Sequence, residues 1–201
     1  MRVRFVDELD GGFGWLETTG LRRTSHALAA DGRVWLLDPF ATNGVEERVR
    51  ALGDAAGVIQ LLDRHNRAGA EWAERLGVPL HVVPRSVPES PFRFVPILHR
   101  RWWSEVALWW ADRRILVCAD ALGTVPDYFR AGDEAIGVHP FLRLLPPRRL
   151  VGLEPLHLLV GHGEGVHGEQ TGRSVDAAIG RARQRIPHWL VGLPRLRKLR
   201  Y

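Results

Sequence analysis

The stretch Leu158-Leu159-Val160-Gly161-His162-Gly163 is an apolar strand that ends in a histidine between two glycines. Glycine lets the backbone turn sharply and approach a bound ion, so this triplet suits a ligand histidine in a tight loop. Ile115-Leu116-Val117-Cys118-Ala119-Asp120 has the same build and ends in an aspartate, and Pro96-Ile97-Leu98-His99 ends in a second histidine. Three predicted strands therefore end in side chains of the metal-ligand type.

Strand and helix patterns alternate along the rest of the chain. Asp31-Gly32 is a hairpin signal between apolar stretches at residues 24–29 and 33–37, and residues 45–52 follow a helical pattern. Further strands are expected at residues 14–18, 58–62, 78–83, 92–98, 106–110, 114–118 and 156–160. Hairpins interspersed with helices in both halves predict helices on the outer faces of two stacked sheets.

Two more helices are expected, one in each half of the chain. Residues 66–76 carry apolar side chains at helical spacing, and Gly77 follows as a stop signal. Ser174 is a candidate N-cap for a helix that reaches about Arg185 and is stopped by Pro187. A basic tail is expected from about residue 186.

This order of elements resembles the metallo-β-lactamase superfamily from about Ser25 to His162. The resemblance implies one α/β domain over residues 1–201, built as a four-layer αββα sandwich, and a metal-dependent hydrolase activity. It also implies roles for three residues. His99 stands where the family has a histidine ligand, Asp120 where it has a metal-bridging aspartate, and His162 where it has its last histidine ligand.

The loop Leu61–Ala70 departs from the family's metal-binding signature, which reads His-x-His-x-Asp-His with a glycine two residues later. With Gly69 on that glycine, the four ligand positions hold Leu62, Arg64, Asn66 and Arg67. Leucine offers no lone pair, and arginine is a permanent cation that does not ligate metals. Two cations at about 4 Å would each oppose a divalent ion by several kcal/mol. A dinuclear zinc centre is therefore not expected.

His99, Asp120 and His162 would still suffice in type for one zinc, manganese or iron ion. An open three-ligand site of this kind could activate water, with Asp120 and His162 as the catalytic residues. Asp63 and His65 fall between the lost ligand positions on a strand-end count. They would join the site only if the loop turned them inward, which we do not expect. The first hypothesis is thus a hydrolase of unknown substrate with at most one metal ion.

A metal-free protein is the alternative hypothesis. In that case Asp120 would pair with Arg64 or Arg67 across the former metal site, one charge replacing another. The two arginines could also bind an anionic small molecule such as a phosphate or carboxylate, for which the guanidinium fork is well shaped.

The net charge of +5 is concentrated at the carboxyl end, where residues 181–201 hold seven basic side chains and no acidic one. A basic tail can bind nucleic acid, which is a third hypothesis. No aromatic side chains alternate with these charges as they do in single-strand binders, so nucleic acid is the least favoured partner.

The single cysteine, Cys118, lies in an apolar run, which predicts a buried thiol and excludes an internal disulfide. We expect a cytoplasmic protein on this ground. No apolar run reaches the roughly 18–20 residues that span a bilayer, so no membrane association is expected. The sequence leaves the substrate and the oligomeric state open.

Overall fold

The amino-terminal half of the chain forms a six-stranded sheet in the computed structural model, which describes residues 2–65 and 67–196. In spatial order its strands are β1 (Val3–Leu9), β2 (Gly12–Glu17), β3 (Thr24–Ala30), β4 (Arg33–Leu37), β5 (Asp54–Gln60) and β6 (Leu80–Val82). Strands β1 to β4 pair antiparallel, whereas β4, β5 and β6 run parallel. Each parallel step needs a crossover, and a helix provides it.

The second sheet comes from the carboxyl-terminal half and has five strands. In spatial order these are β13 (Val166–His167), β12 (His157–Val160), β9 (Ile115–Cys118), β8 (Trp103–Trp110) and β7 (Arg93–Arg100). Strands β9 and β12 are parallel neighbours, so both of their carboxyl ends lie at the same edge of the sheet. A separate two-stranded ladder joins β10 (Leu122–Gly123) to β11 (Gly137–Val138).

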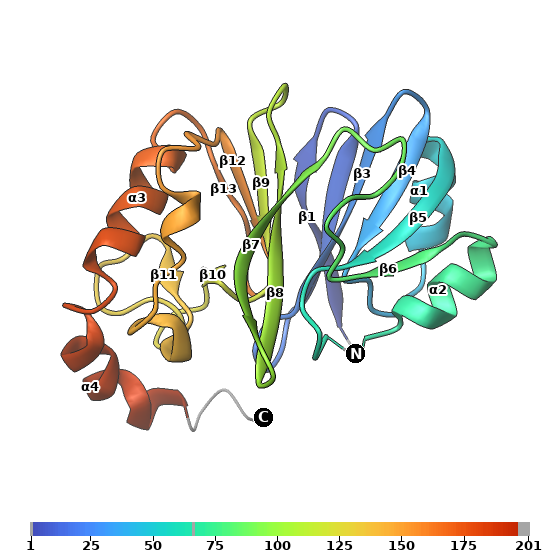
Figure 1. Cartoon of the computed structure of the whole chain (residues 1–201). Helices are drawn as coiled ribbons and strands as arrows, with labels where there is room; N and C mark the ends of the chain where they lie inside the picture. Colours follow the sequence, from blue (N-terminus) through green and yellow to red (C-terminus); the bar gives the residue numbers. More distant parts are fainter. Residues whose placement is uncertain (1, 66, 197–201) are drawn as a thin grey trace.

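Helices lie on the outer faces of both sheets (Figure 1). Helices α1 (Val45–Leu52) and α2 (Gly69–Leu76) cover the first sheet, and α3 (Thr171–Arg181) covers the second, with α4 (Ile186–Leu196) following it. Two short 3-10 turns, η1 (Pro140–Leu142) and η2 (Arg148–Leu150), lie in the connection that precedes β12. The predicted four-layer αββα arrangement is confirmed.

Two apolar clusters hold these layers together. The larger joins inward residues of the first sheet, such as Trp35 and Ile59, to the second sheet and to Val175 of α3. The smaller packs the outer face of the first sheet against α1 and α2 through residues such as Trp15 and Trp72. Burial of each such side chain contributes about 1.5–3 kcal/mol, so the stacking of the sheets follows from the alternating apolar pattern.

The structure corrects two predictions about the carboxyl-terminal helices. Helix α3 begins at Thr171, so Ser174 lies inside it rather than capping it, and the helix ends at Arg181 instead of Arg185. The segment expected to be a tail from residue 186 is helical as far as Leu196. Pro187 does not stop this helix because it lies in the first turn, where the missing N–H costs nothing. Residues 197–201 lie outside the described residues.

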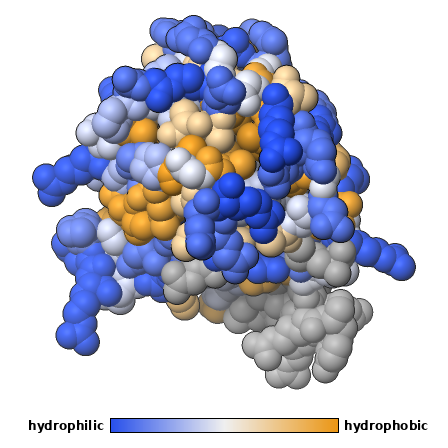
Figure 2. Space-filling view, turned by 90° about the vertical axis from the view of Figure 1, so that its right-hand side faces the viewer, coloured by the Kyte–Doolittle hydropathy of each residue, from blue (hydrophilic) through white to orange (hydrophobic). Residues whose placement is uncertain are grey.

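The surface over α1 and α2 is mostly hydrophilic, with apolar groups visible between the charged side chains (Figure 2). Among the charged residues of these helices, Glu46 forms ion pairs with Arg50 and with Arg75. Cys118 is buried, as predicted. No helix among the described residues is long and apolar enough to cross a membrane.

Candidate metal centre

The ends of parallel strands from both sheets meet at one place in the molecule. Asp38 follows β4 and the loop that begins at Leu61 follows β5, while Asp120 follows β9 and His162 follows β12. Backbone hydrogen bonds join the sheets here, from Thr24 N–H to the Gly161 carbonyl (2.8 Å) and from Val106 N–H to the Leu61 carbonyl (3.0 Å). Loops that start on different sheets are therefore held against one another.

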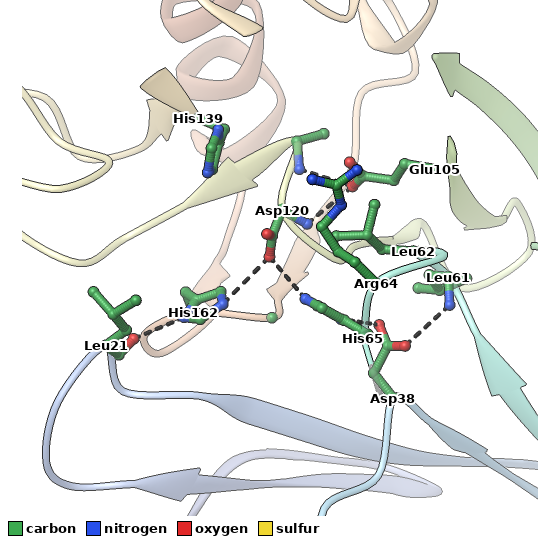
Figure 3. Close-up of polar contacts among 12 residues, drawn as sticks. Leu21, Asp38, Leu61, Leu62, Arg64, His65, Glu105, Asp120, His139 and His162 are labelled. Atoms are coloured by element: carbon green, nitrogen blue, oxygen red, sulfur yellow. Dashed lines mark hydrogen bonds and ion pairs between the residues drawn. The ribbon is translucent and has the colours of Figure 1, made fainter. Parts of the chain in front are cut away.

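Three side chains of the ligand type converge on one point at this junction. Asp120 Oδ1 lies 3.0 Å from His65 Nε2 and 3.3 Å from His162 Nε2. One ligand atom from each of the three residues lies within 4.8 Å of the other two. Figure 3 shows the two imidazoles approaching the carboxylate from opposite sides. The side chains of His65, Asp120 and His162 are only 8%, 13% and 10% exposed, so the group is largely shielded from water.

The outer nitrogen of each imidazole faces an oxygen acceptor. His162 Nδ1 donates to the Leu21 carbonyl at 2.8 Å. His65 Nδ1 lies 3.1 Å from Asp38 Oδ2, at an angle that falls short of hydrogen-bond geometry. Asp38 is fixed in turn by the Leu61 N–H, which donates to Oδ1 at 3.0 Å. With an ion bound, each imidazole would keep a hydrogen on its outer nitrogen and direct the Nε2 lone pair inward, the arrangement that metal-ligating histidines usually show.

Glu105 on β8 holds the turn that carries Asp120. Its Oε1 accepts the N–H groups of Asp120 (2.9 Å) and Ala121 (2.8 Å), and its Oε2 accepts the indole N–H of Trp103 (2.9 Å). Burial, followed by the charge of Asp120, raises the pKa of Glu105 to about 8. Glu105 is thus largely neutral at pH 7, and it positions the Asp120 backbone without adding a second negative charge.

Asp120 and His65 are a charged pair in the absence of metal. Burial acts to raise the pKa of Asp120, but hydrogen bonds from His162 and His65 outweigh it and hold that pKa well below its ordinary value. Burial acts to lower the pKa of His65, yet Asp38 and Asp120 together raise it to about 9 against the opposing charge of Arg67. A proton on His65 therefore occupies the place that a cation would take.

The two loop arginines do not pair with Asp120. The guanidinium of Arg67 donates to three backbone carbonyls, those of Thr24 (2.6 Å), Asp38 (3.1 Å) and Gly161 (3.1 Å), and so ties the two sheets together. Arg64 donates to the Trp102 carbonyl and stacks over the Trp103 ring. Backbone carbonyl oxygens thus already occupy the guanidinium group of Arg67.

Sequence reasoning placed Asp120 and His162 together, and the structure brings them together. It does not bring His99 to them: this histidine is exposed on β7, with Nδ1 2.8 Å from Ser104 Oγ. The third member is instead His65, which we expected from the sequence to point away from the site. The loop turns it inward through the bond from His65 N–H to the Leu62 carbonyl (3.0 Å). Leu62 is fully buried in the apolar core.

Two other residues of the loop fall outside the group. Asp63 faces Arg64 at 3.4 Å and lines a neighbouring cleft of about 450 Å³ together with His99. Asn66 lies outside the described residues. The positions that hold the group from behind, Asp38 and Glu105, were not found from sequence. The one signal for Asp38 was its place directly after an apolar strand and before a proline.

An aromatic wall lies beside His162. Phe129 stacks on its ring with centroids 5.7 Å apart. Burial lowers the pKa of His139 to about 4, and its Nδ1 accepts the Phe141 N–H, so the proton is on Nε2. That nitrogen donates to the Tyr128 hydroxyl oxygen at 3.1 Å, which leaves the hydroxyl hydrogen available to donate elsewhere.

Comparison with known proteins identifies the fold. No family model matches the chain, and no curated protein sequence matches it. Among solved structures, DIM-1 metallo-β-lactamase aligns with a TM-score of 0.64 at 9% identity, over 90% of this chain and 98% of that one. FIM-1 from Pseudomonas aeruginosa, described in its mono-zinc form, aligns with a TM-score of 0.60 at 8% identity over 91% and 97%. A putative diflavin flavoprotein from Nostoc sp. PCC 7120 gives 0.64 at 13% identity over 91% and 97%. The chain therefore has the metallo-β-lactamase fold, and these low identities establish the fold alone.

Proposed function

We propose that this protein is a hydrolase that uses one metal ion, held by His65, Asp120 and His162. The observation that supports this most is the convergence of His65 Nε2 and His162 Nε2 on Asp120 Oδ1, while their outer nitrogens face Asp38 and the Leu21 carbonyl. Two imidazoles and one carboxylate form a three-ligand set that suits zinc, manganese or iron. When bound, such an ion acts as a Lewis acid that activates water.

The residues around the group have separate tasks in this proposal. Asp38 and the Leu21 carbonyl keep the two imidazole rings oriented, and Glu105 fixes the backbone on which Asp120 stands. The proton of His65 must leave when an ion enters. The Tyr128 hydroxyl accepts the hydrogen of His139 Nε2, so its own hydrogen can be donated to a bound substrate.

The charges of the site favour an anionic substrate. With a divalent ion held by neutral imidazoles, the positive charges of the ion and Arg67 would exceed the negative charges of Asp38 and Asp120 by one. In a nearly dry site an excess charge is costly unless an anion compensates it. A substrate with a carboxylate or phosphate group would supply that compensation.

A metal-free binding protein is the second candidate, and one observation favours it. Protonated His65 lies between Asp38 and Asp120, so the buried charges are paired without an ion. The version of this hypothesis in which Arg64 and Arg67 grip an anion has less support, because both guanidinium groups donate to backbone carbonyls of the protein.

Metal binding by matched variants tests the proposal. The protein is stripped with a chelator and dialysed against zinc, manganese or ferrous ion, and bound metal is counted per chain. We expect His65→Ala, Asp120→Ala and His162→Ala each to lose one ion relative to the wild type. His99→Ala is the control and should lose none. Equal metal content in the wild type and in the Asp120→Ala and His65→Ala variants would overturn the proposal and leave the metal-free candidate.

A further inference from the structure

Four other residues form a second histidine cluster, none of which belongs to the proposed metal centre. His157 on β12 and His167 on β13 are direct cross-strand partners. Their Nδ1 atoms are 3.0 Å apart, and their ring centroids are 5.2 Å apart at an interplanar angle of 53°. Behind them, Asp7 on β1 and His26 on β3 complete the cluster. The cluster therefore spans the edges of both sheets.

Asp7 sets the protonation of His167. Its Oδ1 lies 3.1 Å from His167 Nε2 and accepts the Gly165 N–H at 2.8 Å. Burial acts to raise the pKa of Asp7, but hydrogen bonds from His167 and His26 outweigh it and leave the pKa below its ordinary value. The ionised carboxylate can only accept, so His167 Nε2 carries the hydrogen and donates it. The lone pair of His167 is then on Nδ1 and points at His157 Nδ1.

Asp7 is itself fixed from the opposite side. Its Oδ2 lies 3.0 Å from His26 Nε2, and both side chains are buried, at 2% and 3% exposed. The pair reaches across the intervening strand β2 at Gly14, where an added Cβ would lie 2.9 Å from the His26 ring and 3.2 Å from Asp7 Oδ2. A rigid carboxylate behind a histidine is the usual support of a metal-ligating imidazole.

We propose that His157 and His167 bind one transition-metal ion through their two Nδ1 atoms, at a site separate from the His65–Asp120–His162 centre. With metal–nitrogen bonds of about 2.0–2.1 Å, nitrogens 3.0 Å apart subtend about 95° at the ion. That angle fits neighbouring ligands of a square-planar or octahedral ion better than a tetrahedral pair, which favours Ni²⁺ or Cu²⁺. Without an ion, His157 Nδ1 donates its hydrogen to His167 Nδ1.

The pair is open to solvent, which an ion needs for entry and for its remaining water ligands. The His167 side chain is 36% exposed, and His157 lines a groove of about 590 Å³ together with Glu8, Asp10 and Arg113. Burial and then the nearby His167 lower the pKa of His157, so the neutral imidazole that binds metal is the prevailing form. Arg113 is engaged by Asp10 at 3.5 Å.

An ion at this pair would link β12 and β13 of the second sheet. Asp7 of the first sheet already bonds to His167, so the linked pair is also held against that sheet. Binding to the folded state alone raises stability in proportion to the logarithm of the ion concentration over its dissociation constant. We therefore expect Ni²⁺ to raise the melting temperature of an Asp120→Asn chain, and the rise to disappear when His157→Ala or His167→Ala is added.

Nickel titration in a chain that lacks the first centre tests this site independently of the proposed function. In an Asp120→Asn background, bound Ni²⁺ is counted by equilibrium dialysis for the parent, His157→Ala, His167→Ala and the control His99→Ala. We expect one ion per chain, at least tenfold weaker binding for either pair variant, and no change for the control. Equal affinity in all four chains, or an equal loss in the control, would overturn the proposal. If Asp120→Asn does not fold, the same variants are made in the wild-type chain. His157→Ala and His167→Ala should then each bind one Ni²⁺ ion fewer per chain than the wild type.

The role of Asp7 has its own signature. Asp7 orients His167 without touching the ion. Asp7→Asn should therefore weaken Ni²⁺ binding at this pair by about 10–100-fold, while at saturating Ni²⁺ the pair still binds one ion per chain. The position is checked by anomalous diffraction from a nickel-soaked crystal, with a peak expected about 2.0–2.1 Å from each of the two Nδ1 atoms. A peak elsewhere, or unchanged affinity in a folded Asp7→Asn protein, would contradict the assignment.

Discussion

The two histidine clusters of this protein use a carboxylate in opposite ways. In the first, Asp120 stands between His65 and His162 and offers its own oxygen to the point where they meet. In the second, Asp7 stands behind His167, and the two imidazoles face each other without it. The first is nearly buried and holds paired charges, whereas the second is half open. The difference shows that a carboxylate serves as ligand or as support according to which nitrogen it faces.

Exchange of each aspartate for asparagine tests that contrast most strongly. Asp120→Asn removes a ligand and a charge, so the first centre should lose its ion completely. Asp7→Asn removes only a support, so the second site should weaken by about 10–100-fold and keep its capacity. Metal titration of both proteins, with circular dichroism to verify folding, measures the two effects. Similar losses in both variants would show that the two carboxylates have the same role.

Removal of Glu105 should have the largest effect on stability. Glu105→Ala leaves three buried donors without an acceptor, the N–H groups of Asp120 and Ala121 and the Trp103 indole. At about 1–3 kcal/mol for each of the three unsatisfied groups, the free energy of unfolding should fall by about 3–9 kcal/mol. Urea denaturation measures it. Glu164→Ala, which removes only exposed ion pairs, is the control and should cost less than about 1 kcal/mol. If Glu105→Ala lowered the free energy of unfolding by as little as Glu164→Ala, Glu105 would not be what holds the turn that carries Asp120.

The stability of the metal-free protein should fall as the pH rises from about 6.5 to 9. The folded pKa of His65 is about 9, above its unfolded value of 6.5, so its contribution is complete below pH 6.5 and is lost above pH 9. The full contribution amounts to about 3 kcal/mol. Because Glu105 titrates in an overlapping range, the measurement is the difference between wild type and His65→Gln, unfolded by urea at each pH with chelator present. A difference that does not change with pH would mean that Asp38 and Asp120 do not hold a charged His65.

Loss of Arg64 should have the smallest effect. This exposed side chain contacts the Trp102 carbonyl, Asp63 and the Trp103 ring, and it does not hold the group at Asp120. We expect Arg64→Ala to cost less than about 1 kcal/mol of stability and to leave metal binding unchanged. Thermal unfolding and metal titration measure both quantities. A tenfold change in metal affinity would show that Arg64 does contribute to the metal site.

Most of the fold could be predicted from the sequence because its layers depend on the pattern of apolar residues and on the residues that form turns. The strand Arg33–Leu37 and the helix Val45–Leu52 were predicted to the residue, since Asp31-Gly32 and the helical spacing mark their ends. Strand β1 was missed because its alternating charged residues hide it at the edge of the sheet. The start of α3 was also missed, since no side chain caps it.

Only part of the metal centre could be predicted from the sequence. Asp120 and His162 follow strands whose parallel pairing fixes where they end, so strand position predicted them. His65 lies on a loop whose path depends on contacts made far along the chain, including the bond from Asp63 N–H to the Ser104 carbonyl (3.0 Å). Counting positions from Gly69 could not show this turn. His99 was assigned to the site because it ends the apolar stretch Pro96-Ile97-Leu98, as Asp120 and His162 end theirs.

Anomalous diffraction from a crystal soaked in zinc tests the central claim most directly. The account predicts one peak within about 2.0–2.2 Å of His65 Nε2, Asp120 Oδ1 and His162 Nε2. A peak at His99, or no density at Asp120 in a crystal that has taken up zinc elsewhere, would contradict it.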